Sequence, residues 1–155
     1  MTATNANPKH DIKVLNALIE TTLDSAEGYR EAAEKTEVSS HRDMFQRWAT
    51  DRRQVVTDLQ GQVRALGGKP DEDGSILGAT HRVFLKVRDS ITKGDDSVVD
   101  EVERGEDFIK AKYEDALEDE ELSASVRDVV VRAYSSVKAG HDQARDLKRA
   151  VHAKH

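Results

Sequence analysis

Three side chains that could do chemistry lie on the inward faces of the expected helices. Glu106 lies almost at the centre of the apolar stripe of its helix, and His141 lies within the stripe of the last helix. Arg52 lies near the centre of a third stripe, one turn after Trp48. A buried charge is unfavourable by several kcal/mol unless it is paired or bound to a metal. These positions are therefore where a functional or structural site is expected.

One chemistry that suits these residues is metal binding. Carboxylate oxygens and imidazole nitrogens are ligands of iron and manganese. Di-iron and di-manganese bundles take a Glu from each of two helices and a Glu-x-x-His pair from each of the other two. The candidate ligands here are Glu106 and His141, with Glu27, Asp51 or Glu103 completing the set. Iron or manganese is the cofactor that this interpretation allows.

The ligand pattern is incomplete on two helices. Gln54 stands where the helix over 39–66 would need a His, and Lys138 stands where the last helix would need a Glu. The alternative is a buried charge cluster of Arg52, Glu106, His141 and Lys138, in which cations replace the metal. A guanidinium can neutralise a buried carboxylate with a planar fork of donors, and Glu106 or Glu27 would be its partner. This second interpretation predicts no catalytic residue and no cofactor.

Four long helices must position these side chains. Apolar residues at alternating steps of three and four predict helices over 10–36, 39–66, 97–118 and 123–151, and a shorter amphipathic helix over 75–92. Ser39 or Ser40 is the expected N-cap of the second helix, and Asp96 or Ser97 that of the helix over 97–118. Gly67-Gly68, followed by Pro70, predicts a left-handed stop after the second helix.

The loop lengths predict how the helices connect. Short loops make two antiparallel hairpins, and the long segment between them can carry the chain from one end of the bundle to the other. We therefore expect an all-α, ferritin-like four-helix bundle with an additional crossover helix. Residues 1–9 are expected to be a flexible tail, and residues 10–152 a single domain.

Composition limits the classes of function. The chain has 155 residues, of which 37% are hydrophobic and 35% charged, and it has no cysteine. Disulfides, cysteine nucleophiles and thiolate metal sites are thereby excluded. A formal net charge of −6 argues against nucleic-acid binding. No membrane-spanning run or secretory signal is visible, so we expect a cytoplasmic protein.

Several stretches together resemble one protein family. They are Leu18–Thr21, Glu27–Ala33, Phe45–Arg47, Leu66–Gly68, Glu103–Asp107 and Val137–Asp142. In this combination and order, the chain over residues 11–150 resembles a bacterial family of ferritin-like four-helix-bundle proteins of unknown function. The resemblance implies a ferritin-like bundle in a bacterial cytoplasm. Rubrerythrins and bacterioferritins are more distant relatives by fold, and their ligand pattern carries over at Glu106, His141 and Glu27.

Two functions from different classes follow. The favoured hypothesis is a non-enzymatic structural or interaction protein, associated with stress, whose metal centre has degenerated. Self-association as a homodimer is expected, and no protein partner can be named. The alternative is an iron- or manganese-binding protein with oxidase or iron-handling activity. The position of Arg52 relative to Glu106 discriminates between them, because a guanidinium bonded to this carboxylate leaves little space for an ion.

Overall fold

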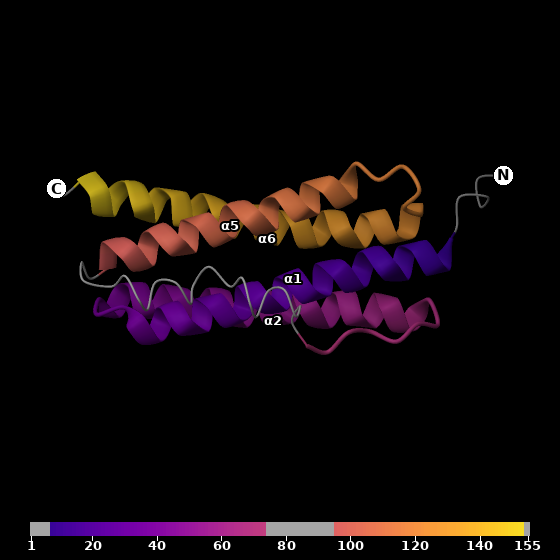
Figure 1. Ribbon diagram of the computed structural model, residues 1–155, viewed down its shortest axis with the longest axis horizontal. Helices are drawn as coiled ribbons and strands as arrows, with labels where there is room; N and C mark the ends of the chain where they lie inside the picture. Colours follow the sequence, from indigo (N-terminus) through magenta and orange to yellow (C-terminus); the bar gives the residue numbers. More distant parts are fainter. Residues whose placement is uncertain (1–6, 74–94, 154–155) are drawn as a thin grey trace.

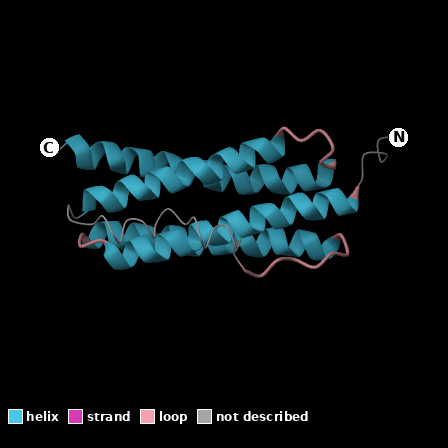
Figure 2. Cartoon of the chain, viewed as in Figure 1, coloured by secondary structure: helices cyan, strands magenta, loops and turns pink. Residues whose placement is uncertain are grey.

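The protein is built of α-helices in every part of the chain that the structure describes. The computed structural model describes residues 7–73 and 95–153. The helices are α1 (Pro8–Lys35), α2 (Ser39–Ala65), α5 (Asp95–Leu117) and α6 (Ala124–Ala153). Over these ranges there is no β-strand (Figure 2). The four long helices predicted from the apolar stripes are confirmed, with ends that differ by two residues at most.

The helices form two antiparallel hairpins that pack side by side. Figure 1 shows α1 and α2 as one pair and α5 and α6 as the other. The end of α2 and the beginning of α5 lie at opposite ends of the bundle (Figure 1). The connection between the hairpins therefore joins opposite ends of the molecule, as the long predicted crossover requires. The helix expected over 75–92 lies outside the described residues. Within those residues, no helix combines the length and the apolarity that crossing a bilayer would need.

The helix ends show which local signals were informative. Helix α1 begins at Pro8, where Asn7 accepts a hydrogen bond from the backbone N–H of His10, so the expected tail over 1–9 extends too far. Gly67 has a φ of 84° after α2, which confirms the predicted left-handed stop. The predicted serine cap of α2 is wrong. The extended residue before this helix is Val38, and Ser39 already lies inside the first turn.

A buried aspartate joins the two hairpins at one end of the bundle. Asp11 of α1 accepts hydrogen bonds from the backbone N–H of Ser123 at 3.1 Å and from its hydroxyl at 2.7 Å. Ser123 directly precedes α6, and its hydroxyl donates to Asp11. The carboxylate of α1 thus satisfies an N–H at the start of α6, where the helix dipole favours negative charge.

The apolar core is divided into two clusters along the bundle. The larger cluster includes Leu15, Leu59, Tyr113 and Val130, and the smaller one includes Tyr29, Phe45, Val99, Val102 and Ala144. Between the two clusters, each helix carries a polar or small residue instead of a large apolar one. These residues are Ser25 on α1, Arg52 on α2, Glu106 on α5 and Gly140 on α6. The candidate site lies in this layer.

Candidate functional site

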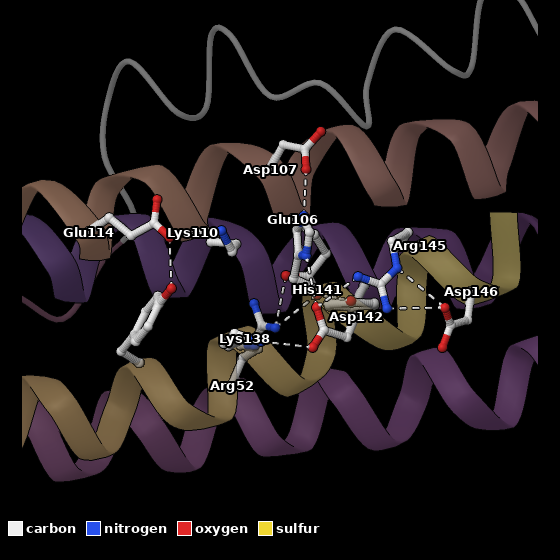
Figure 3. Close-up of polar contacts among 12 residues, drawn as sticks. Arg52, Glu106, Asp107, Lys110, Glu114, Lys138, His141, Asp142, Arg145 and Asp146 are labelled. Atoms are coloured by element: carbon white, nitrogen blue, oxygen red, sulfur yellow. Dashed lines mark hydrogen bonds and ion pairs between the residues drawn. The ribbon is translucent and has the colours of Figure 1, made fainter. Parts of the chain in front are cut away.

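An ion pair lies at the centre of the bundle. The Nη2 atom of Arg52 donates to both oxygens of Glu106, at 2.9 Å and 2.8 Å. Both side chains are almost fully buried, with 0% and 1% of their surface exposed. Figure 3 shows Arg52 pointing from α2 toward Glu106 on α5. Of the two partners expected for Arg52, the structure places Glu106 beside it.

Side chains from α1 and α2 complete the surroundings of the pair. The phenol of Tyr29 donates to the Oε2 atom of Glu106. Ser25 accepts a hydrogen bond of 2.9 Å from Nη1 of Arg52. The guanidinium carbon lies 5.5 Å from the ring centre of Tyr29 and 5.6 Å from that of Trp48. Hydrogen bonds and aromatic faces therefore replace much of the hydration that the guanidinium loses on burial.

Helix α6 contributes space to the site. A Cβ atom on Gly140 would lie 2.3 Å from Nη2 of Arg52 and 3.1 Å from Oε2 of Glu106. The same atom would lie 3.2 Å from the Trp48 ring. Only a residue without a side chain lets the backbone of α6 pass this close to the ion pair.

The protonation states of the site follow from burial and from the pair itself. Burial has the largest effect on the pKa of Arg52 and would lower it, but the neighbouring groups, foremost the charge and the hydrogen bonds of Glu106, together raise the pKa above its ordinary value. Burial, followed by the negative charge of Glu106, raises the pKa of Tyr29 well above its ordinary value. Arg52 is thus held as a cation, and Tyr29 as a neutral phenol that can donate.

Three other residues predicted for the site lie elsewhere. Glu27 pairs with Arg30 on the same helix. Asp51 accepts a hydrogen bond from the hydroxyl of Ser136. Lys138 is 54% exposed, and its ammonium lies 3.1 Å from a carboxylate oxygen one turn further along α6. The prediction that Lys138 joins the buried charge cluster is therefore wrong. Two residues before Gly140, it points away from the axis of the bundle.

His141 lies beside the site and outside the buried layer. Its Nε2 atom lies 2.6 Å from Oδ1 of Asp107, and Figure 3 shows these two side chains facing each other from α6 and α5. Glu103, one turn before Asp107, belongs to the same group of potential ligand atoms. The expectation that His141 and Glu106 share one cluster is wrong. The residue of α6 that lies against Glu106 is Gly140.

The buried layer does not fit a di-metal centre. A carboxylate ligand must direct a free lone pair at the metal, and both oxygens of Glu106 accept hydrogen bonds from Arg52. The Oε2 atom also accepts one from Tyr29. His141 and Glu27 have their partners outside this layer. A positive guanidinium in van der Waals contact with the carboxylate also repels any cation that would share it.

Sequence reasoning did not identify three residues of the site as functional. Tyr29 lies on the apolar stripe of α1, where its position alone indicates a core residue, but a buried phenol usually has a hydrogen-bond partner. Ser25 lies three residues after Thr22, which is at the centre of that stripe, so it is on the same face of α1. Gly140 could have been noticed because it directly precedes His141, which the sequence predicted to face inward. Glycine inside a long helix is unfavourable unless close packing requires it.

These observations define a class: an all-α protein of four packed helices with a buried arginine–glutamate pair between two apolar clusters. A family model described as Domain of unknown function (DUF2383) matches residues 10–119, which is more than two thirds of the chain. The chain belongs to this family. The match covers nearly all of α1 and the whole of α2 and α5, and α6 lies entirely beyond it. No curated protein matches the chain.

Proposed function

We propose that this protein is a ferritin-like bundle whose metal centre has been replaced by the Arg52–Glu106 pair, and that it serves as a non-enzymatic structural or interaction protein. The observation that carries the proposal is the pair of hydrogen bonds, 2.9 Å and 2.8 Å long, from one guanidinium nitrogen to both Glu106 oxygens. They occupy the acceptor positions that a catalytic metal would need.

The surroundings of the pair support the same function. A catalytic centre needs an open position for substrate, whereas this layer is filled by Tyr29, Trp48 and the backbone at Gly140. A buried ion pair is weak evidence for stability, but breaking one is strongly unfavourable. Such a pair therefore selects the arrangement of four helices in which both charges meet.

The proposal includes a bacterial, cytoplasmic setting and self-association as a homodimer. The support for association is the apolar stripe in the sequence of the segment between α2 and α5, at Ile76, Val83, Phe84, Val87 and Ile91. Sedimentation equilibrium is the direct measurement, and we expect a dimer. A chain that stays monomeric at high micromolar concentration would contradict this part of the proposal.

The central test is the metal content of untagged protein purified without chelator. We expect no iron or manganese in the buried layer and no oxidation of added ferrous iron. The informative variant is Asp107→Asn/His141→Ala, because it leaves Arg52 and Glu106 in place. Near-stoichiometric iron or manganese in this variant, or ferrous oxidation by it, would overturn the proposal in favour of the metal-handling alternative.

A further inference from the structure

Three potential metal ligands converge on the surface of the bundle. One ligand atom each from Glu103, Asp107 and His141 lies within 4.8 Å of the other two. Glu103 and Asp107 are four residues apart on α5, so their side chains lie on the same face of the helix. His141 comes from α6 and brings an imidazole to two carboxylates.

The packing of the buried layer places this group. The close passage of α6 at Gly140 brings the next residue, His141, against α5. As a result, the His141 side chain is only 14% exposed, and that of Glu103 only 18%. Asp107 is 57% exposed and leaves the group open to solvent on one side. Two ligands are therefore held by packing while an ion could still enter.

A further carboxylate lies behind the histidine. The Nε2 atom of His141 faces Asp107 at 2.6 Å, and its Nδ1 atom lies 3.4 Å from Oδ1 of Asp142. Histidines that bind metals commonly present their second nitrogen to a carboxylate, which orients the ring and increases its basicity. Asp142 is itself held by Lys138 at 3.1 Å. This arrangement directs Nε2, rather than Nδ1, toward the acidic pair.

We propose that Glu103, Asp107 and His141 form a binding site for one divalent transition-metal ion of the zinc class. The ion would take the place of the direct hydrogen bond between His141 and Asp107. One imidazole and two carboxylates suit zinc, manganese or ferrous iron, whereas magnesium and calcium prefer oxygen ligands alone. The inference does not rest on the proposed function, because none of the three ligands touches the buried ion pair in the described structure.

The present geometry is close to what a tetrahedral ion needs. With ligand distances of about 2.1 Å, the ligand atoms of such an ion lie about 3.4 Å apart. The Asp107–His141 contact is already shorter than this, and the third ligand atom lies within 4.8 Å. The ammonium of Lys148 lies 3.5 Å from Glu103 and has to release this carboxylate. Water would fill the fourth position on the exposed side.

The chain contains a matched control for this site. His152 of α6 lies 2.7 Å from Asp100 of α5, so it forms the same kind of pair between the same two helices. Among the described residues, this second pair is not part of any group of three ligands. A single histidine and one carboxylate bind zinc far more weakly than a set of three ligands.

The experiment is a calorimetric titration of the full chain with Zn²⁺ in the presence of millimolar Mg²⁺. We expect one site per chain in the wild type and in His152→Ala, and binding at least tenfold weaker in His141→Ala and in Asp107→Asn. Circular dichroism checks that each variant is folded. Asp107→Asn is the conservative variant, because the residue is exposed and keeps its shape.

Three results would overturn the inference. The first is the absence of zinc binding by the wild type. The second is that Mg²⁺ competes with zinc for the site as strongly as a second transition metal does. The third is that His152→Ala loses as much zinc affinity as His141→Ala. The outcome is separable from that of the proposed function. Zinc lost from Asp107→Asn leaves the buried-pair proposal standing, whereas near-stoichiometric iron or manganese kept by Asp107→Asn/His141→Ala contradicts the proposed function alone.

Discussion

Two acidic residues that are neighbours on α5 have opposite surroundings. Glu106 is 1% exposed and is neutralised by Arg52, whereas Asp107 is 57% exposed and faces His141. On α6, Gly140 lies against the buried pair, whereas His141 belongs to the surface group that it forms with Glu103 and Asp107. One step of about 100° around each helix thus separates a closed ion pair from an open group of ligands.

The comparison shows that burial, more than residue type, decides what a carboxylate does in this bundle. Inside, desolvation demands a permanent counter-charge, and the Arg52 guanidinium provides it together with hydrogen bonds to both oxygens of Glu106. At the surface, water stabilises the charge, so the partner can be exchanged for a proton or an ion. A centre that binds metal reversibly is therefore better placed at Asp107 than at Glu106.

The largest expected effect is that of breaking the buried pair. Replacing Arg52 by Met leaves Glu106 buried without its cation, and we expect a loss of about 3–5 kcal/mol in the free energy of unfolding. The variant Arg52→Met/Glu106→Leu/Tyr29→Phe removes both charges and the phenol, and it should recover most of this loss. Urea denaturation measures both. If the triple variant is no more stable than the single one, the three side chains do not act as one closed unit.

The glycine beside the pair should be the next most sensitive position. Gly140→Ala places a Cβ atom 2.3 Å from a guanidinium that Glu106 holds in place. We expect a loss of about 1–3 kcal/mol from this overpacking. Gly61→Ala is the matched control in α2, where an added Cβ meets nothing within 4 Å. Gly61→Ala should raise the free energy of unfolding by about 0.5–1 kcal/mol, because alanine favours a helix over glycine. If both variants change the free energy of unfolding in the same direction, this account is contradicted.

A third carboxylate, that of Glu20 on α1, lies near other acidic side chains. A hydrogen bond with Asp71, followed by partial burial, raises the pKa of Glu20 from 4.5 to about 7. The negative charges of Asp71 and Asp24 act in the same direction. A group whose pKa is raised by folding stabilises the protein fully below its unfolded pKa and loses this contribution as the pH rises through its folded value.

The loop that contains Asp71 should therefore be held more firmly at pH 5 than at pH 8. The backbone N–H of Asp71 donates to Asn16 at 2.8 Å, so its hydrogen exchange reports on the docking of the loop. We expect Glu20→Gln, which is neutral at both pH values, to remove most of this pH dependence. An unchanged pH profile in the variant would show that another group is responsible.

The smallest expected change in stability is at the surface group of Glu103, Asp107 and His141. Asp107→Asn removes a charge that is more than half exposed, so stability should change by no more than about 0.5 kcal/mol. The same urea denaturation, at low and at high salt, provides the measurement. A loss above about 1.5 kcal/mol would mean that Asp107 is part of the structural core, and the contrast with Glu106 would disappear.

Much of the fold could be predicted because helix packing leaves a periodic record. The apolar stripes located all four described helices, and Gly67 marked the end of α2 by its need for a positive φ. The inward positions of Arg52 and Glu106 were also visible, since each interrupts an apolar stripe. The serine cap of α2 was not predictable in this way, because serines at the start of a helix fit the cap and the first turn alike.

The amino-acid sequence by itself determined the four helices and the two opposite charges that face the interior. Only the tertiary structure decided which side chains meet: Tyr29 with Glu106, Gly140 against Arg52, and His141 with Asp107. The physical reason is that spacing along one helix defines a direction around its axis. The distance to a neighbouring helix depends on how closely the two backbones pack, and here a single glycine in α6 sets that distance.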